Sequence, residues 1–247
     1  MIHSFIRVYH TNKQQRATQQ SPEKRRTAMG LEMHLYKTKR VEGFSATDYA
    51  YANRTLDYFR EKENAKKNKK EFSHTLEDWG VPESMTLEKA KVLESEYTDK
   101  SPVERFRFFT IFDELGYWKQ ANHIHAWFVK NVQGGTDNWS YYFVTKENLL
   151  ELKEICEKVL ALNPFTIKNH DLFSLIDSGV ITKADYEGIK DKLEELMPTQ
   201  EGFLFGMTHY NEEYFQEVKY TLEIAEEILK NGDFAKYVYF YRAWATM

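Results

Sequence analysis

The most conspicuous candidates for chemistry in this sequence are two histidines, His123 and His125, separated by a single residue. Imidazole is a common metal ligand, but the residues around this pair recur at helical spacing. On a helix, residues two positions apart point about 200° apart around the axis. The two rings therefore cannot bind one ion, and we predict no metal site here.

His125 is the better candidate for catalysis, because a histidine can act as a general acid or base near neutral pH. A histidine on an apolar helix face is, however, more often a hydrogen-bonded core residue than a catalyst. The polar residues expected beside it, at one end of the helix, are Asn122, Lys119 and Asp137. This group predicts, as an alternative function, an enzyme acting on a nucleotide or nucleic acid.

The motifs that define common enzyme classes by their spacing are missing from the sequence. It has no phosphate loop ending in Gly-Lys-Ser/Thr, no Gly-x-Gly-x-x-Gly and no Gly-x-Ser-x-Gly. Its single cysteine, Cys156, falls on an apolar helix face, where we expect an unreactive small hydrophobe. We therefore expect no cofactor and favour a protein that is not an enzyme.

The segment 133–139 is the second place where polar groups gather. It brings amide, carboxylate and indole groups next to two glycines. Loops of this kind form small polar pockets or contact partners, although a helix stop followed by a turn explains the same residues. The predicted binding residues are Trp118, Trp127, Gln133, Asp137, Asn138 and Trp139.

These candidates must be positioned by helices and strands whose limits the sequence also indicates. The strongest helical period covers 115–132 and ends at two consecutive glycines. Other helices are predicted where a capping side chain precedes an apolar period. The capping residues are Ser45, Thr86, Thr145, Thr182 and Asn211. The predicted strands are 33–36, 139–144, 202–208 and 237–241.

The order of these elements predicts the fold class. Helices and strands alternate, but the strands are short and aromatic, unlike the Val/Ile runs of a parallel sheet that is buried on both faces. We therefore predict an α+β fold. We expect a helix-rich single domain with a small, short-stranded, mainly antiparallel sheet.

The first 28 residues differ from the rest of the chain. Residues 1–28 are basic and have no periodic pattern, and the remainder is acidic. We predict a disordered N-terminal extension, with 29–247 forming the single domain. Within that domain 61–104 is a candidate variable insertion, because it carries none of the recognisable motifs.

Composition excludes several function classes. The chain has 247 residues, 42% of them hydrophobic and 29% charged, which is enough to bury a core without disulfides. A single cysteine excludes a disulfide framework and fits a reducing cytoplasm. No apolar stretch is long enough to cross a membrane. The chain has a net charge of −4, and its acidic part, residues 29–247, disfavours broad, non-specific binding to duplex nucleic acid.

Three motifs resemble a known group of proteins. They are Met-Gly-Leu-x-Met at 29–33, Tyr-Trp-x-x-Ala-Asn-x-Ile-His at 117–125 and Gly-Phe-x-Phe-Gly at 202–206. The chain thereby resembles a family of uncharacterised proteins encoded by bacteriophages and prophages, over residues 29 to about 242. The resemblance implies a phage or mobile-element origin and action in the cytoplasm of a bacterial host. It implies no activity.

Aromatic residues make up 15% of the chain, and many fall at core positions. Trp127, Trp139 and Trp244 do not fall at core positions, so they are the first candidates for a binding surface. The leading hypothesis is a phage accessory protein that binds a host or phage protein through aromatic side chains, which dominate interface energetics. Binding of a single nucleic-acid strand by base stacking is a third hypothesis, and the acidic body disfavours it.

Overall fold

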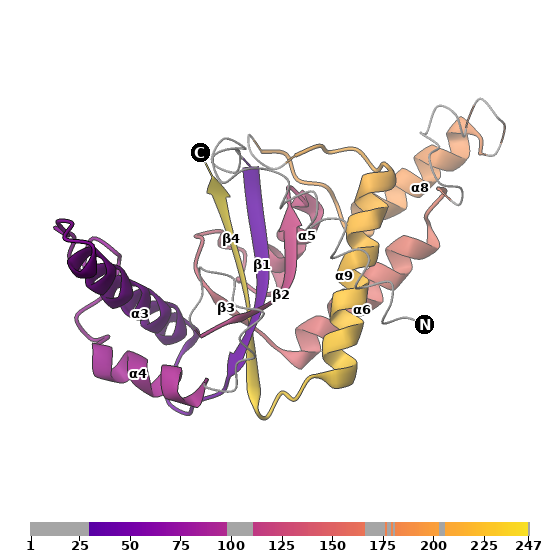
Figure 1. The fold of residues 1–247 in the computed structure, drawn as a ribbon. Coiled ribbons are helices and arrows are strands. Elements are labelled where there is room, and N and C mark those ends of the chain that lie inside the picture. The colour runs from indigo at the N-terminus through magenta and orange to yellow at the C-terminus, as the bar shows by residue number, and fades with distance from the viewer. Residues whose placement is uncertain are drawn as a thin grey trace.

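A four-stranded antiparallel sheet lies at the centre of the described part of the chain (Figure 1). The computed structural model describes residues 30–97, 111–165, 176, 179, 181–202 and 206–246. The strands, in spatial order, are β2 (Asp113–Lys119), β1 (Gly30–Lys39), β4 (Tyr237–Thr246) and β3 (Tyr142–Val144). The pairings of β1 with β2, β1 with β4 and β3 with β4 are all antiparallel.

The helices lie on both sides of this sheet (Figure 1). They are α3 (Ala46–Lys67), α4 (Leu87–Glu96), α5 (Asn122–Asn131), α6 (Lys146–Ala161), α8 (Lys183–Leu196) and α9 (Glu212–Asn231). The predicted helix-rich α+β single domain is confirmed. The two central strands are longer than the sequence indicated, because β1 and β4 each have ten residues and pair along their whole length.

Local chemistry fixes where most helices begin. Each predicted capping side chain accepts a hydrogen bond from the backbone N–H three residues later, which satisfies one donor that the helix itself leaves unpaired. The pairs are Ser45 with Asp48, Thr86 with Lys89, Thr145 with Asn148, Thr182 with Asp185 and Asn211 with Tyr214.

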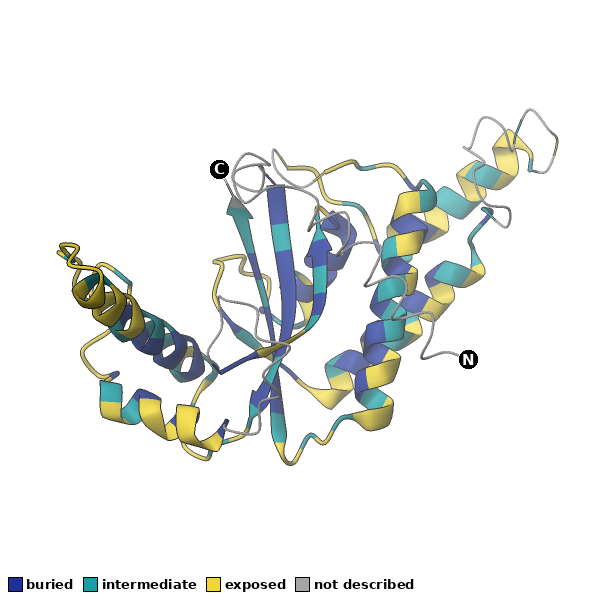
Figure 2. Ribbon diagram, viewed as in Figure 1, coloured by how far each residue is buried: buried dark blue, intermediate teal, exposed yellow. Residues whose placement is uncertain are grey.

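The two faces of the sheet bury different cores. Leu31, Met33 and Leu35 alternate along β1 and pack into a core with residues of α5, α6 and α9. The buried stripes of α6 and α9 face inward, and their exposed sides face solvent (Figure 2). On the opposite face, Tyr36 and Phe240 pack into a second core with residues of α3 and α4.

The predicted helix at 115–132 is wrong in its first half. Residues 113–119 form β2, which pairs with β1, and only the second half is helical as α5. Trp118 points into the core and donates a hydrogen bond from Nε1 to Thr221 Oγ1 at 2.9 Å. The apolar residues of 117–121 happened to match helical spacing, while the pairing that makes a strand involves residues far away in sequence.

Other predictions about segments have different outcomes. Residues 206–208 belong to no strand, so that end of the predicted strand 202–208 is wrong, and residues 203–205 lie outside the described residues. The extension 1–28 also lies outside them. The stretch 61–97 contributes the end of α3 and all of α4, and its status as a variable insertion stays a prediction. No helix in the described part of the chain is long and apolar enough to cross a membrane.

Candidate functional site

The candidate site is the loop 133–141, which follows α5 and leads into β3. The helix ends in Gly134 and Gly135, whose φ angles of 63° and 81° lie in the left-handed region that glycine adopts at low cost. Gly135 N–H donates to the carbonyl of Val129 at 2.8 Å, which closes the end of the helix. Residues 134–140 that follow are all exposed.

His125 joins this loop to the core. The residue is fully buried, with Nε2 2.9 Å from Asp137 Oδ2 and Nδ1 2.8 Å from the hydroxyl of Tyr241. An ionised carboxylate only accepts hydrogen bonds, so Nε2 carries the hydrogen and Nδ1 accepts from the tyrosine. Burial raises the pKa of Tyr241 well above its usual value, and the nearby Asp137 raises it further. Tyr241 therefore stays protonated as the donor.

The far end of the loop is also held by hydrogen bonds. The carbonyl of Trp139 accepts a hydrogen bond from Arg242 Nε at 3.1 Å, and Asn138 Oδ1 accepts from the Tyr142 hydroxyl at 3.0 Å. Arg242 also donates from Nη1 to the Tyr141 hydroxyl at 2.9 Å, with its guanidinium 4.7 Å from the centre of that ring. Two side chains, Arg242 of β4 and Tyr142 of β3, thus hold this end of the loop.

Trp139 is the residue that this loop presents. Its φ of 59° lies in the left-handed region, which a bulky residue rarely occupies. Residues in such conformations persist where the surroundings over-determine them, and they cluster at functional sites. The side chain is 51% exposed although the main chain is fixed. The arrangement can offer a large aromatic surface in one orientation.

The structure brings only part of the predicted catalytic group together. His125 and Asp137 are in contact, as described above. Asn122 instead holds a neighbouring segment, because its side chain donates to the carbonyl of Met207 and accepts from the backbone of Gln200, both at 2.9 Å. Lys119 follows the core-facing Trp118 on β2, so it lies on the opposite face of the sheet from His125.

The predicted binding residues also separate into two sets. Trp118 and Trp127 are 2% and 8% exposed and belong to the core. Gln133 is buried at the start of the loop, where its Oε1 has no hydrogen-bond partner among the described residues. Asp137, Asn138 and Trp139 are exposed. Only these last three can contact a partner directly.

His123 points to a different part of the core from His125. Its ring lies 4.1 Å from that of Tyr214 on α9, and its Nε2 is 3.9 Å from a carboxylate oxygen of Glu217. Burial lowers the pKa of His123 from 6.5 to about 3, so the ring is neutral. The described residues contain no group of three or more His, Cys, Asp or Glu side chains placed to hold a metal.

A second polar cluster escaped the sequence analysis. On the sheet face opposite His125, His34 Nδ1 lies 2.7 Å from Glu114 Oε2, and the ring stacks on Trp244 at 4.3 Å and 5°. Arg242 lies 4.8 Å from the Trp244 ring. The sequence does contain a partial indication of this cluster. His34 and Tyr36 on β1, like Arg242 and Trp244 on β4, are two residues apart and therefore share a face of their strand. Pairing of three distant strands brings them together.

Comparison of the chain with protein-family models, with curated proteins and with solved structures gives no match. The geometry of the loop and of its supports therefore carries the functional conclusion.

Proposed function

We propose that this protein is a non-enzymatic accessory protein that binds a macromolecule through the loop 133–141, with Trp139 as the central contact. The partner class we propose is a host or phage protein. The phage or mobile-element setting rests on the motif resemblance in the sequence, and the binding role rests on the loop.

The supporting observation is that Trp139 is half exposed on a main chain that is already fixed. Large aromatic side chains dominate binding energy at protein interfaces. Association is weakened by the entropy lost when loops become ordered, and a preorganised loop avoids that loss. The hydrogen bonds from Arg242 to the Trp139 carbonyl and from His125 to Asp137 supply this preorganisation.

The enzymatic alternative has weaker support. A general acid or base needs an atom within hydrogen-bond reach of the substrate. Both ring nitrogens of His125 are occupied by Asp137 and Tyr241, and its side chain is 1% exposed. The geometry favours a bridging role for His125, in which it holds the loop and does not transfer a proton.

The proposal is tested by capture from bacterial lysates, with and without phage induction, using three immobilised proteins. They are the unaltered chain, Trp139→Ala and Leu150→Ala. Trp139→Ala keeps the carbonyl that Arg242 binds. Leu150 is matched in exposure, at 49%, but lies on α6. We expect a protein retained by the unaltered chain and by Leu150→Ala and lost with Trp139→Ala. An identical set of captured proteins with all three would overturn the proposal.

A further inference from the structure

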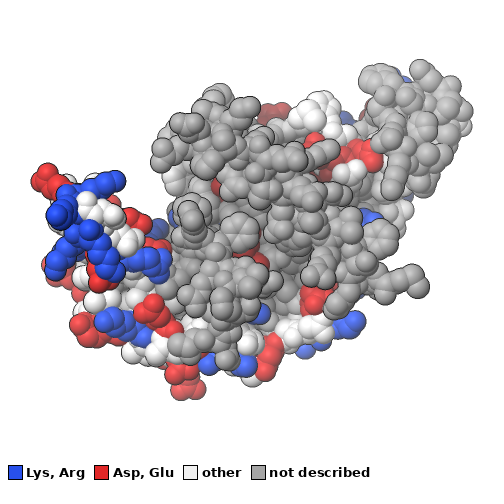
Figure 3. Space-filling model, in the orientation of Figure 1, with Lys and Arg blue, Asp and Glu red and all other residues white. Residues whose placement is uncertain are grey.

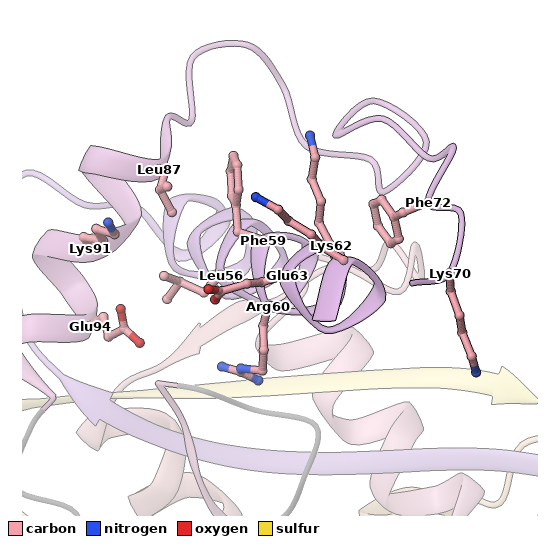
Figure 4. Close-up of a pocket in the computed structure, with 11 residues that line it drawn as sticks. Leu56, Phe59, Arg60, Lys62, Glu63, Lys70, Phe72, Leu87, Lys91 and Glu94 are labelled. Atoms are coloured by element: carbon pink, nitrogen blue, oxygen red, sulfur yellow. The ribbon is translucent and has the colours of Figure 1, made fainter. Parts of the chain in front are cut away.

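A pocket of about 740 Å³ lies between α3 and α4 (Figure 4), and no residue of the loop 133–141 lines it. Its apolar lining comes from both helices and from the segment between them. These residues are Leu56, Phe59, Phe72 and Leu87. In Figure 4 the ring of Phe59 stands between Leu87 of α4 and Lys62 of α3.

The rest of the lining is predominantly cationic. It contains Arg60, Lys62, Lys66, Lys70 and Lys91, against Glu63 and Glu94. Basic side chains gather over the end of α3 on the face seen in Figure 3. The whole chain carries a net charge of −4, so this concentration does not follow from the overall composition.

Most of these cations form no ion pair among the residues that the structure describes. Lys62, Lys66, Lys70 and Lys91 form no ion pair with a carboxylate of the described residues. Some lysines elsewhere in the described residues are paired, as Lys153 is with Glu226 at 2.9 Å, so what distinguishes the pocket is that its unpaired lysines surround apolar side chains. One of the two lining carboxylates, Glu63, is paired with Lys67 outside the pocket at 3.8 Å. The pocket therefore has more basic than acidic side chains around an apolar floor.

We infer that this pocket binds an acidic peptide segment of a partner protein, with a bulky apolar side chain of that segment on Phe59 and its carboxylates at the lysines. Opposite charges across an interface set specificity and association rate, and an amphipathic segment in a groove is a common mode of peptide recognition. The site is separate from the Trp139 loop and does not depend on it.

A nucleic acid fits the same surface less well. Phosphates would meet the lysines, and a base could stack on a phenylalanine. The aliphatic side chains of Leu56 and Leu87, however, suit an apolar side chain better than a polar base edge.

The test measures the fluorescence anisotropy of labelled probes titrated with the full chain. The first probe is a 15-residue peptide with Leu and Phe at helical spacing and Glu at the other positions. The second carries Lys in place of Glu, the third carries Ser in place of Leu and Phe, and the fourth is a 15-nucleotide thymidine oligonucleotide. We expect the first to bind most tightly, with an affinity that falls as salt is added.

Two double variants with the same change in net charge locate the site. Lys62→Glu/Lys66→Glu reverses two lysines of the pocket, and Lys183→Glu/Lys192→Glu reverses two exposed lysines of α8. We expect the pocket variant to weaken binding of the acidic peptide roughly tenfold or more and the α8 variant to leave it within about twofold. Phe59→Ser should also weaken it, since the apolar floor contributes.

Three results would overturn the inference. The acidic peptide does not bind at all, or both double variants weaken it equally, which would mean that only overall charge matters. Alternatively, the oligonucleotide binds more tightly than the peptide and is lost in the pocket variant, which would make the occupant a nucleic acid. Circular dichroism of each variant confirms that it folds before its titration is interpreted.

Discussion

Nε2 of His125 lies 2.9 Å from Oδ2 of Asp137, and this contact connects a fully buried ring on α5 with an exposed loop. The two residues are 12 positions apart, on either side of the paired glycines. The histidine is held in turn by the hydroxyl of Tyr241 on β4. The sheet, the helix and the loop are thus joined by one hydrogen-bonded chain that ends two residues before Trp139.

Removing the carboxylate should loosen the loop. In Asp137→Ala the buried Nε2–H of His125 loses its acceptor, which costs about 1–3 kcal/mol of folding free energy. The amides of residues 134–140 should exchange with solvent faster than in the unaltered protein. Denaturant unfolding measures the first effect, and hydrogen–deuterium exchange measures the second.

Thr136→Ala is the matched control for Asp137→Ala, because Thr136 lies in the same exposed loop and its side chain forms no hydrogen bond with the described residues. It should change neither stability nor exchange appreciably. Equal exchange of the loop in the two variants would mean that the histidine does not hold it.

Acid should destabilise the fold partly through His123. Burial lowers its pKa to about 3 in the folded state, against about 6.5 when unfolded. The stability that this difference represents is fully present above pH 6.5. It is lost as the pH falls towards 3, at roughly 1.4 kcal/mol per pH unit.

His123→Phe removes this titration and should flatten the fall of the unfolding free energy between pH 6.5 and 4. The exposed His209 provides the control, since His209→Phe should leave the slope unchanged. Denaturant unfolding at several pH values measures both. Equal slopes for the two variants would contradict a buried, neutral His123.

Two glycines should respond to alanine in opposite directions. Gly206 has a φ of +90°, and an added Cβ would lie 2.7 Å from the backbone carbonyl oxygen of Gln120. Gly206→Ala should therefore destabilise the protein by about 1–3 kcal/mol. Gly188 lies inside α8 with open space around it, so Gly188→Ala should stabilise by about 0.5–1 kcal/mol. Thermal unfolding of both variants measures the sign of each change in stability. If Gly206→Ala were stabilised, the close approach of Gly206 to the Gln120 carbonyl would be wrong.

The features predicted correctly from the sequence are those set by near neighbours. A helix start depends on a side chain and a backbone N–H three residues away, so Thr145 and Asn211 were found from their surroundings alone. The sequence also predicts that Asp137 lies near His125, because a short loop that follows a helix stays close to the end of that helix.

The features that the sequence did not predict depend on contacts between residues far apart in the chain. Lys119 was placed beside His125 because residues 115–121 match a helical period, but pairing with β1 makes them a strand and turns Lys119 to the other face. The contact between His34 and Glu114 spans 80 residues. The residues next to His34 in the sequence do not indicate that Glu114 is its partner, and the reverse is also true. Alternation along each strand indicates only which side chains share a face.

The most direct test of the proposed function is the affinity of the captured partner for three forms of the purified chain. Titration by isothermal calorimetry should show that Trp139→Ala weakens binding by about 2 kcal/mol or more, roughly 30-fold. Leu150→Ala should bind like the unaltered protein. If Trp139→Ala binds with the unaltered affinity, the loop is not the contact surface and the account of its function is wrong.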